Sequence, residues 1–271
     1  MPIEYRPIIS PEEIKLVADL HGPIWSTDDR DAIPAHLLTA IGHAGGLVLG
    51  AFDGDRAVGF VVGFLGIRDG MVLHWSHATG VLPEYQGRGI GSNLKWLQRQ
   101  LVLAQGYDCI AWTYDPLQRG NASLNIRRLG CVCNRYHDNF YGTMHDGLNT
   151  GLPSDRFEVR WWLNHERVRL RQYTLPPPPD IANAHCVLSK MDDGSPGPIR
   201  WPAETAHVLV EIPESINHLK ETQPDKALRW RLQTRQVFTR LFAEGFVVTD
   251  FVSQEAGEQK RCWYLLASDC P

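Results

Sequence analysis

The pattern of apolar and polar positions near the N-terminus predicts a strand followed by two helices. Residues 3–9 have the composition of a short strand. The sequence Ser-Pro-Glu-Glu at 10–13 then supplies an N-cap, a proline at the first helical position and acidic residues in the first turn. This predicts a helix that continues to about Leu20, and we expect a second helix at about 33–41.

Between residues 46 and 83 the pattern changes to short β-rich runs. Three such runs are separated by Asp-Gly-Asp at 53–55 and by Asp-Gly at 69–70, and both clusters favour tight turns. Tight turns place consecutive strands side by side in opposite directions. The region therefore predicts an antiparallel meander.

An amphipathic helix is predicted to begin directly after the meander. Lys95 and Arg99 are placed on its polar side. Gly106 ends the helix, a buried strand is expected at 109–115, and a short helix at 121–129 stops at a second glycine. Strands that alternate with helices predict an α/β domain. The apolar stripe of the amphipathic helix consists of Ile90, Leu94, Leu97, Leu101 and Ala104.

Four consecutive prolines at 176–179 form a stiff extended spacer, which predicts a domain boundary. We therefore divide the chain into an N-terminal domain at 1–172, a proline-rich linker at 173–184 and a smaller α/β C-terminal unit at 185–271. In this last unit we expect strands at 207–213, 246–252 and 261–267 and a helix at 226–243.

Two explanations remain open for the C-terminal unit. The sequence FAEGF at 242–246 ends its helix much as LAQGY at 103–107 ends the earlier one, and each helix follows a strand that ends in proline. A degenerate internal repeat and chance similarity account for this match about equally well. The connecting segment 214–226 contains no glycine, so a second copy would lack a loop able to approach a phosphate.

Composition and charge favour a small partner. Apolar residues make up 43% and charged residues 21% of the 271 residues, as in a chain with a packed core. The net charge of −4 offers no field to attract nucleic acid or an anionic membrane, and no apolar run is long enough to span one. The N-terminus is too polar for a signal peptide, so we expect a cytoplasmic protein whose six cysteines are reduced.

The strongest chemical motif is Gln-Gly-Arg-Gly-Ile-Gly at 86–91, between the meander and the amphipathic helix. Its three glycines allow successive backbone N–H groups to converge at the positive end of the helix, where a pyrophosphate fits. A glycine pair alone would indicate only a tight turn. A dinucleotide-binding fold would place the motif after the first strand of a parallel unit, whereas three antiparallel runs precede it here.

With this motif in this position, the chain resembles the GNAT superfamily of CoA-dependent acyltransferases. The family's pyrophosphate loop has Gln or Arg, two residues, Gly, one residue, then Gly or Ala, which Gln86, Gly89 and Gly91 satisfy. The resemblance covers the element order over residues 3–141 and includes Asn-Ala at 121–122 and Leu-Gly at 129–130.

The resemblance implies a mixed, mostly antiparallel sheet flanked by helices, with acetyl-CoA or another acyl-CoA as co-substrate and no metal. It also implies an opening between the strand at 74–81 and the strand at 109–114, where the former pairs with the pantetheine arm. The residues implied to bind the cofactor are Thr79, Gly80, Val81, Gln86, Gly87, Arg88, Gly89, Ile90, Gly91, Ser92 and Asn121.

The sequence offers more than one residue for each group that donates or accepts a proton. Many family members protonate the departing thiolate with a tyrosine, but the aligned position here is Ile126, so Tyr136 and Tyr141 are the alternatives. His74 and His77 have a suitable intrinsic pKa for general-base catalysis. Strand alternation places these two histidines on opposite faces, so at most one should face the opening.

The segment 115–162 is rich in polar and aromatic residues and is the predicted substrate region. It is similar to a GNAT subgroup that is associated with amino-acid acylation, including succinyl transfer. We assign three polar residues of this segment, Asp115, Asn125 and Arg156, to substrate binding. Arg156 can pair with a carboxylate of the acceptor or of a succinyl donor.

The sequence therefore predicts an enzyme that transfers an acetyl or succinyl group from CoA to an amine of a small molecule such as an amino acid, with a homodimer as one assembly. A CoA-binding regulatory protein without catalysis and a protein N-acetyltransferase are the alternatives.

Overall fold

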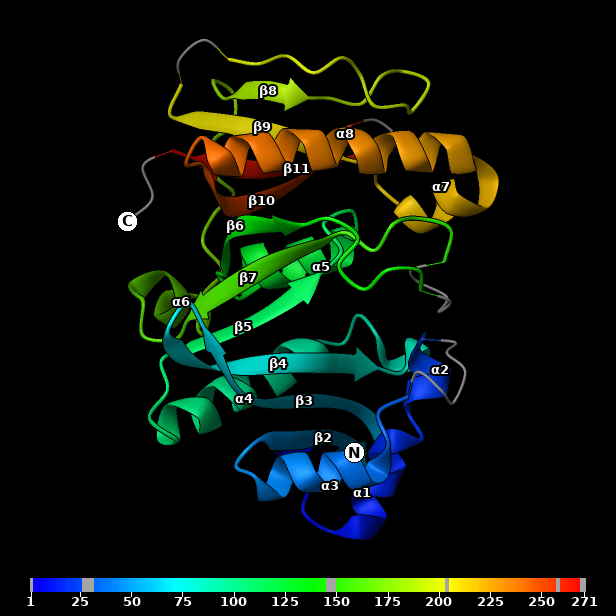
Figure 1. Ribbon diagram of the computed structural model, residues 1–271, viewed down its shortest axis with the longest axis vertical. Coiled ribbons are helices and arrows are strands. Elements are labelled where there is room, and N and C mark those ends of the chain that lie inside the picture. Colours follow the sequence, from blue (N-terminus) through cyan, green and yellow to red (C-terminus); the bar gives the residue numbers. More distant parts are fainter. Residues whose placement is uncertain (1, 26–31, 145–149, 203–204, 257–258, 269–271) are drawn as a thin grey trace. The chain divides into compact units, whose positions relative to one another are not determined.

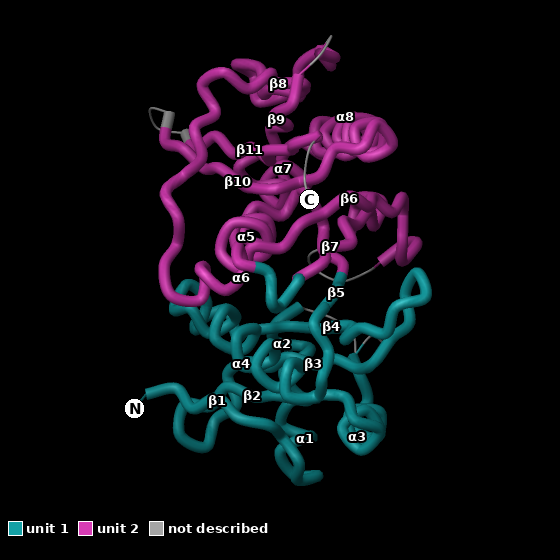
Figure 2. The backbone as a smooth tube through the Cα atoms, turned by 90° about the vertical axis from the view of Figure 1, so that its left-hand side faces the viewer, with its two compact units in different colours: residues 1–112, 145–148, 162–165 teal, residues 113–144, 149–161, 166–271 magenta. Residues whose placement is uncertain are grey.

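The structure, a computed structural model, describes residues 2–25, 32–144, 150–202, 205–256 and 259–268. Its backbone forms two compact units (Figure 2). Among the helices in these ranges, none is both long enough and apolar enough to cross a membrane. Unit 1 contains residues 1–112, 145–148 and 162–165, and unit 2 contains residues 113–144, 149–161 and 166–271.

The N-terminal part of unit 1 follows the sequence prediction closely. Strand β1 (Glu4–Pro7) leads into helix α1 (Pro11–Ala18). The hydroxyl of Ser10 accepts the backbone N–H of Glu13 at 3.3 Å, which confirms the predicted N-cap. A short helix that was not predicted, α2 (His21–Trp25), precedes the second predicted helix, α3 (Ala35–His43).

The predicted antiparallel meander is also present. It consists of β2 (Leu47–Asp53), β3 (Arg56–Arg68) and β4 (Met71–Val81), joined by the two aspartate-glycine turns. Strand β1 pairs with β2, and β5 (Cys109–Tyr114) runs parallel to β4, so the order in this unit is β1-β2-β3-β4-β5 (Figure 1). A parallel neighbour requires a crossover, and the predicted amphipathic helix provides it.

This crossover helix, α4 (Ile90–Ala104), lies on the opposite face of the sheet from α3. A methyl group built on Gly63 of β3 would meet Gln98 of α4, whereas the next residue, Phe64, lines a pocket with side chains of α3. Successive strand residues point to opposite faces, so the two helices cover the two sides of the sheet. The helix ends before Gly106, whose φ of +88° is a left-handed conformation.

One prediction about α4 is wrong. Lys95 was placed on the polar side of the helix, but the structure leaves only 2% of it exposed. The face of α4 that packs on the sheet is wider than the predicted stripe, because Lys95 contacts Ser76 of β4 and Trp112 of β5. Val102, one heptad after Lys95 and therefore on the same side, is fully buried and is the sequence signal that indicates this wider face.

Unit 2 begins with the end of β5. A short helix, α5 (Arg119–Ala122), continues into a π-helical turn, η3 (Ser123–Arg128), close to the predicted 121–129 helix. Strands β6 (Val132–His137) and β7 (Arg156–Trp162) pair in antiparallel fashion. The remaining elements are α6 (Glu166–Arg171), β8 (His185–Leu188), β9 (His207–Ile212), α7 (Ile216–Thr222), α8 (Pro224–Ala243), β10 (Val247–Ala256) and β11 (Gln259–Ala267).

The strand order in unit 2, β7-β6-β10-β11-β9-β8, bears on the possible internal repeat. Gly106 and Gly245 end the two compared helices with the same φ of +88°. Nevertheless β4 pairs directly with β5, whereas β9 and β10 each pair in antiparallel fashion with β11 between them. The similarity thus extends to the helix-glycine-strand junction but not to the pairing of the strands.

Unit 2 takes in residues on both sides of the predicted proline-rich linker at 173–184. The connection 214–226, which lacks glycine, folds as helical structure in which the Ser215 hydroxyl accepts the N–H of His218. The sequence-based division at this linker stays a prediction. Of the six cysteines, Cys270 lies outside the described residues, and the five others are free thiols.

Candidate functional site

The predicted phosphate-binding loop has the backbone conformation that its glycines suggest. Gly87 has φ +76°, and Gly89 has φ +81° as the N-cap of α4. A side chain at either position would meet nothing within 4 Å, so the left-handed backbone, and not crowding, is what requires glycine. A loop with this geometry turns its amides toward the open side of the helix end.

The amides of this loop are available to a ligand. Within the described residues, no backbone N–H group of residues 87–92 has a hydrogen-bond acceptor. The N–H of Asn93, in contrast, donates to the carbonyl of Gly89 at 3.0 Å. No side chain caps the helix. Unpaired amides at the positive end of a 15-residue helix form a site for an anion.

Two side chains of the motif stabilise the loop itself. The amide of Gln86 donates to the carbonyl of Val81 at 3.1 Å, which ties the loop to the end of β4. Arg88 donates to the carbonyl of Glu84 at 2.9 Å, and its guanidinium lies 4.9 Å from the centre of the Tyr85 ring. These contacts hold the cation beside the free amides, where it adds positive charge.

The carboxyl-terminal half of β4 has one unpaired edge in unit 1. On one side its residues Thr79 to Val81 pair with β3. On the other side, pairing with β5 is confined to His74 with Ile110 and Trp75 with Ala111, so among the described residues of unit 1 the edge beyond Trp75 has no partner strand. An extended chain that carries amide groups, such as a pantetheine arm, can bond to such an edge.

A β-bulge distinguishes the two candidate histidines. The register between β3 and β4 passes from Val62 opposite Ala78 to Gly63 opposite Ser76, which leaves His77 as the extra residue. His77 is exposed, and its ring centre lies 5.9 Å from that of Phe64. Protein atoms packed around the imidazole lower the pKa of His77 below its usual value of 6.5, which favours the neutral form of the ring.

His74 lies in a buried polar network on the other face of β4. It is fully buried, and the side-chain amide of Gln98 donates to its Nε2 at 3.1 Å. Lys95 donates to Ser76 Oγ at 2.8 Å and to Gln98 Oε1 at 3.0 Å, and its Nζ lies 3.7 Å from the centre of the Trp112 ring. Burial, and then the nearby ammonium, lower the pKa of His74 to about 4. The sequence did not indicate this network.

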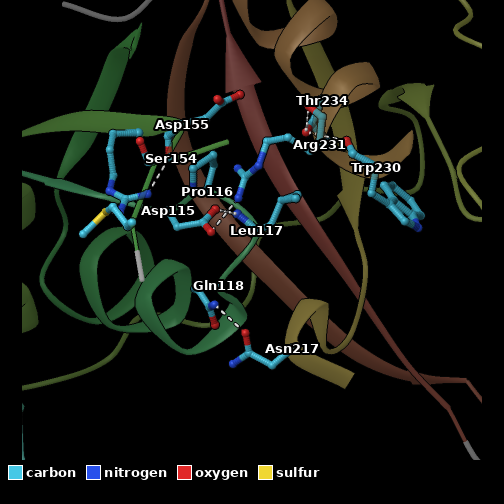
Figure 3. Close-up of polar contacts among 12 residues, drawn as sticks. Asp115, Pro116, Leu117, Gln118, Ser154, Asp155, Asn217, Trp230, Arg231 and Thr234 are labelled. Carbon is cyan, nitrogen blue, oxygen red and sulfur yellow. Dashed lines mark hydrogen bonds and ion pairs between the residues drawn. The ribbon is translucent and has the colours of Figure 1, made fainter. Parts of the chain in front are cut away.

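The predicted substrate residues in unit 2 are occupied by contacts within the chain. Asp115 accepts the N–H of Leu117 at 2.9 Å and the guanidinium of Arg231 at 2.6 Å (Figure 3). Asn125 is buried in η3, where its carbonyl accepts the N–H of Cys131. Arg156 donates to the carbonyl of Asp155 and lies 5.2 Å from the centre of the Tyr141 ring. Asn121, assigned to the cofactor, is exposed in α5.

The two candidate tyrosines differ in their surroundings. The hydroxyl of Tyr136 donates to Asp155 at 2.6 Å, and burial raises its pKa well above 10. Tyr141 is 45% exposed, and its hydroxyl lies 3.0 Å from that of Thr113. Ile126, at the position of the usual tyrosine, is fully buried. In the described part of the chain, no three His, Cys, Asp or Glu side chains group closely enough to hold a metal ion.

The chain was compared with protein families, curated proteins and solved structures. One similar solved structure is an acetyltransferase of the GNAT family from Streptococcus pneumoniae, with 16% identity, coverage of 59% of this chain and 98% of that chain, and a TM-score of 0.47. A second is the ribosomal-protein-S18-alanine N-acetyltransferase from Escherichia coli, with 11% identity, coverage of 60% of this chain and 96% of that chain, and a TM-score of 0.49. A third is NAA60 from Arabidopsis thaliana in complex with acetyl-CoA, with 16% identity, coverage of 59% of this chain and 99% of that chain, and a TM-score of 0.47. No curated protein matches the chain in sequence. Residues 13–124, which contain the meander, the loop and β5, match the model of the acetyltransferase (GNAT) family. Through this match, the N-terminal domain of the chain is assigned to the acetyltransferase (GNAT) family.

Proposed function

We propose that this protein transfers an acyl group, acetyl or succinyl, from CoA to the primary amine of a small molecule such as an amino acid. The observation that carries the proposal is the set of unpaired amides at residues 87–92, beside an unpaired edge of β4. A pyrophosphate on the amides and a pantetheine arm along the edge would direct the thioester toward the bulge at His77.

The chemistry follows from this placement. The amine nitrogen attacks the thioester carbonyl carbon, a backbone N–H of β4 stabilises the oxyanion, and the carbon–sulfur bond then breaks. His77 accepts the proton that the amine loses, because a neutral imidazole is required for this role. The CoA thiolate then takes up a proton; Tyr141 stays the sequence-based candidate for its donor, because the hydroxyl of Tyr136 already donates to Asp155.

A thermal-shift experiment tests the cofactor site. Acetyl-CoA and succinyl-CoA at about 100 times their Kd should stabilise the wild-type protein by roughly 2.7 kcal/mol. Gly89→Glu should abolish this shift, because a carboxylate at the helix N-cap repels the pyrophosphate. An unchanged shift in this variant would contradict the loop assignment.

Gly106→Glu is the matched control. Gly106 also has a positive φ and open space around it, so both variants carry a similar backbone strain, but it lies at the other end of α4. The control should retain the full shift. Mass spectrometry of the products from a mixed panel of acyl-CoA and amines then tests turnover, and binding without any product would favour a regulatory protein.

A further inference from the structure

Unit 1 contains a pocket that the proposed chemistry does not yet use. It lies between α3 and the sheet and has a volume of about 510 Å³. Sites for small ligands usually occupy about 300 to 1,000 Å³, so the pocket is large enough for a side chain and the groups next to it. Its lining consists of Ala32, Ile33, Pro34, Leu37, Ile41, Phe64 and His77.

The walls of this pocket are apolar except at one point. Leu37 and Ile41 stand one turn apart on α3, and Phe64 faces them from β3. Leu37 is 46% exposed, so apolar surface remains open to a ligand at the rim. Because the described residues of these walls, His77 aside, offer no hydrogen-bonding side chain, they favour a ligand part that is apolar itself.

His77 is the polar exception, and it connects the pocket to the proposed reaction. The bulge in β4 adds this residue to the strand and leaves its ring beside Phe64, at the wall of the pocket. The lowered pKa favours the neutral form of the ring, which can accept a proton. An amine beside His77 would therefore have its neighbouring substituent against Leu37, Ile41 and Phe64.

We infer that the pocket binds the side chain of the acceptor, and that the acceptor class is a small primary amine whose α-carbon carries a branched aliphatic or aromatic group. This inference rests on the proposed function and specifies its substrate. Hydrophobic pockets discriminate by about 10- to 200-fold for each methylene that they bury, so a leucine-like group should be favoured at least tenfold over hydrogen.

The test compares leucinamide with glycinamide, which present α-amines of similar basicity and differ in the side chain. In the wild-type protein, kcat/KM with acetyl-CoA should be at least tenfold higher for leucinamide. Calorimetry in the presence of CoA should show the same order of Kd. Leu37→Asp should bring the ratio of kcat/KM for leucinamide to that for glycinamide close to one, chiefly by raising KM for leucinamide.

Leu16→Asp serves as the control, because Leu16 is a similarly exposed leucine on α1, with 42% exposure, that does not line the pocket. It should keep the preference for leucinamide. Equal kcat/KM and equal Kd for the two amides in the wild-type protein would overturn the inference, and so would a preference that survives Leu37→Asp. Failure of the proposed function would look different, since acyl-CoA would then give no thermal shift or neither amide would be acylated.

Discussion

At the scale of single residues, two histidines three positions apart on β4 have different chemical environments. His74 points toward α4, where burial and the neighbouring Lys95 keep it neutral and Gln98 bonds to its ring. His77 is exposed and stands at the pocket. The sequence placed the pair on opposite faces but could not choose between them. The register of β4 against β3 makes His77 the better candidate for the base.

Replacing His77 by glutamine should lower kcat by about 10²- to 10⁴-fold, since a general base typically contributes that much. The pH profile adds a second readout. The base works only when neutral, and protein atoms packed around its ring lower its pKa, so the acidic limb of kcat should be centred below pH 6.5.

Steady-state kinetics between pH 5 and 8 measure both effects. His43→Gln, at an exposed histidine at the end of α3, is the control and should leave kcat and the acidic limb unchanged. A kcat within threefold of the wild type for His77→Gln, or an acidic limb centred above pH 6.5, would assign the base to another group.

At the scale of elements, the contact between α4 and the β3–β4 pair depends on a glycine. A methyl group on Gly63 would stand 2.2 Å from Nε2 of His74 and 2.8 Å from the carbonyl oxygen of Trp75. The backbone oxygen cannot move away cheaply, and the histidine is enclosed by Gln98 of α4. The sequence offered no sign of this close approach, because the contact joins three separate elements.

Gly63→Ala should therefore lower the free energy of unfolding by about 1 to 3 kcal/mol, the usual cost of overpacking a core. Gly66→Ala is the matched variant on the same strand, where the added methyl group would make only an ordinary contact of 3.7 Å with Trp75. It should change stability by less than about 0.5 kcal/mol. Urea denaturation of both variants measures their free energies of unfolding. Equal values would show that the contact between α4 and the sheet accommodates the added methyl group.

At the scale of the whole molecule, unit 2 joins segments that are far apart in the sequence. Arg231 of α8 is 1% exposed and bonds to Asp115, which stands 116 positions earlier, just after β5. Arg235 of the same helix binds Asp155 with two hydrogen bonds of 2.9 and 2.8 Å. Removing residues 180–271 would take α8 and both guanidinium partners away from these carboxylates, so such a truncation would alter the folding of unit 2.

Arg231→Met should destabilise the protein by about 3 to 5 kcal/mol, because it leaves the Asp115 carboxylate buried without its cation. Adding Asp115→Asn removes that charge and should recover part of the loss. Chemical denaturation followed by tryptophan fluorescence measures both. If the double variant were no more stable than Arg231→Met, the charge of Asp115 would not be the cause.

The sequence by itself determined the features that depend on neighbouring residues. The aspartate-glycine turns predict the meander and Ser10 predicts its helix cap, and both are confirmed. The glycines at 87 and 89 adopt the left-handed backbone that glycine permits. Each follows from steric limits or hydrogen bonds within a few residues, which any chain of this sequence obeys. The family's loop motif and its cofactor class belong to this group.

Only the tertiary structure decided the features that join distant segments. The register of β4 produced the bulge at His77, the packing of α4 buried Lys95, and α8 supplied the partner of Asp115. A bulge depends on how two strands pair, and a buried charge is stable only when distant groups receive its hydrogen bonds. The sequence therefore predicted a CoA site at the glycine-rich loop, whereas the fold selected the candidate base and formed the apolar pocket beside it.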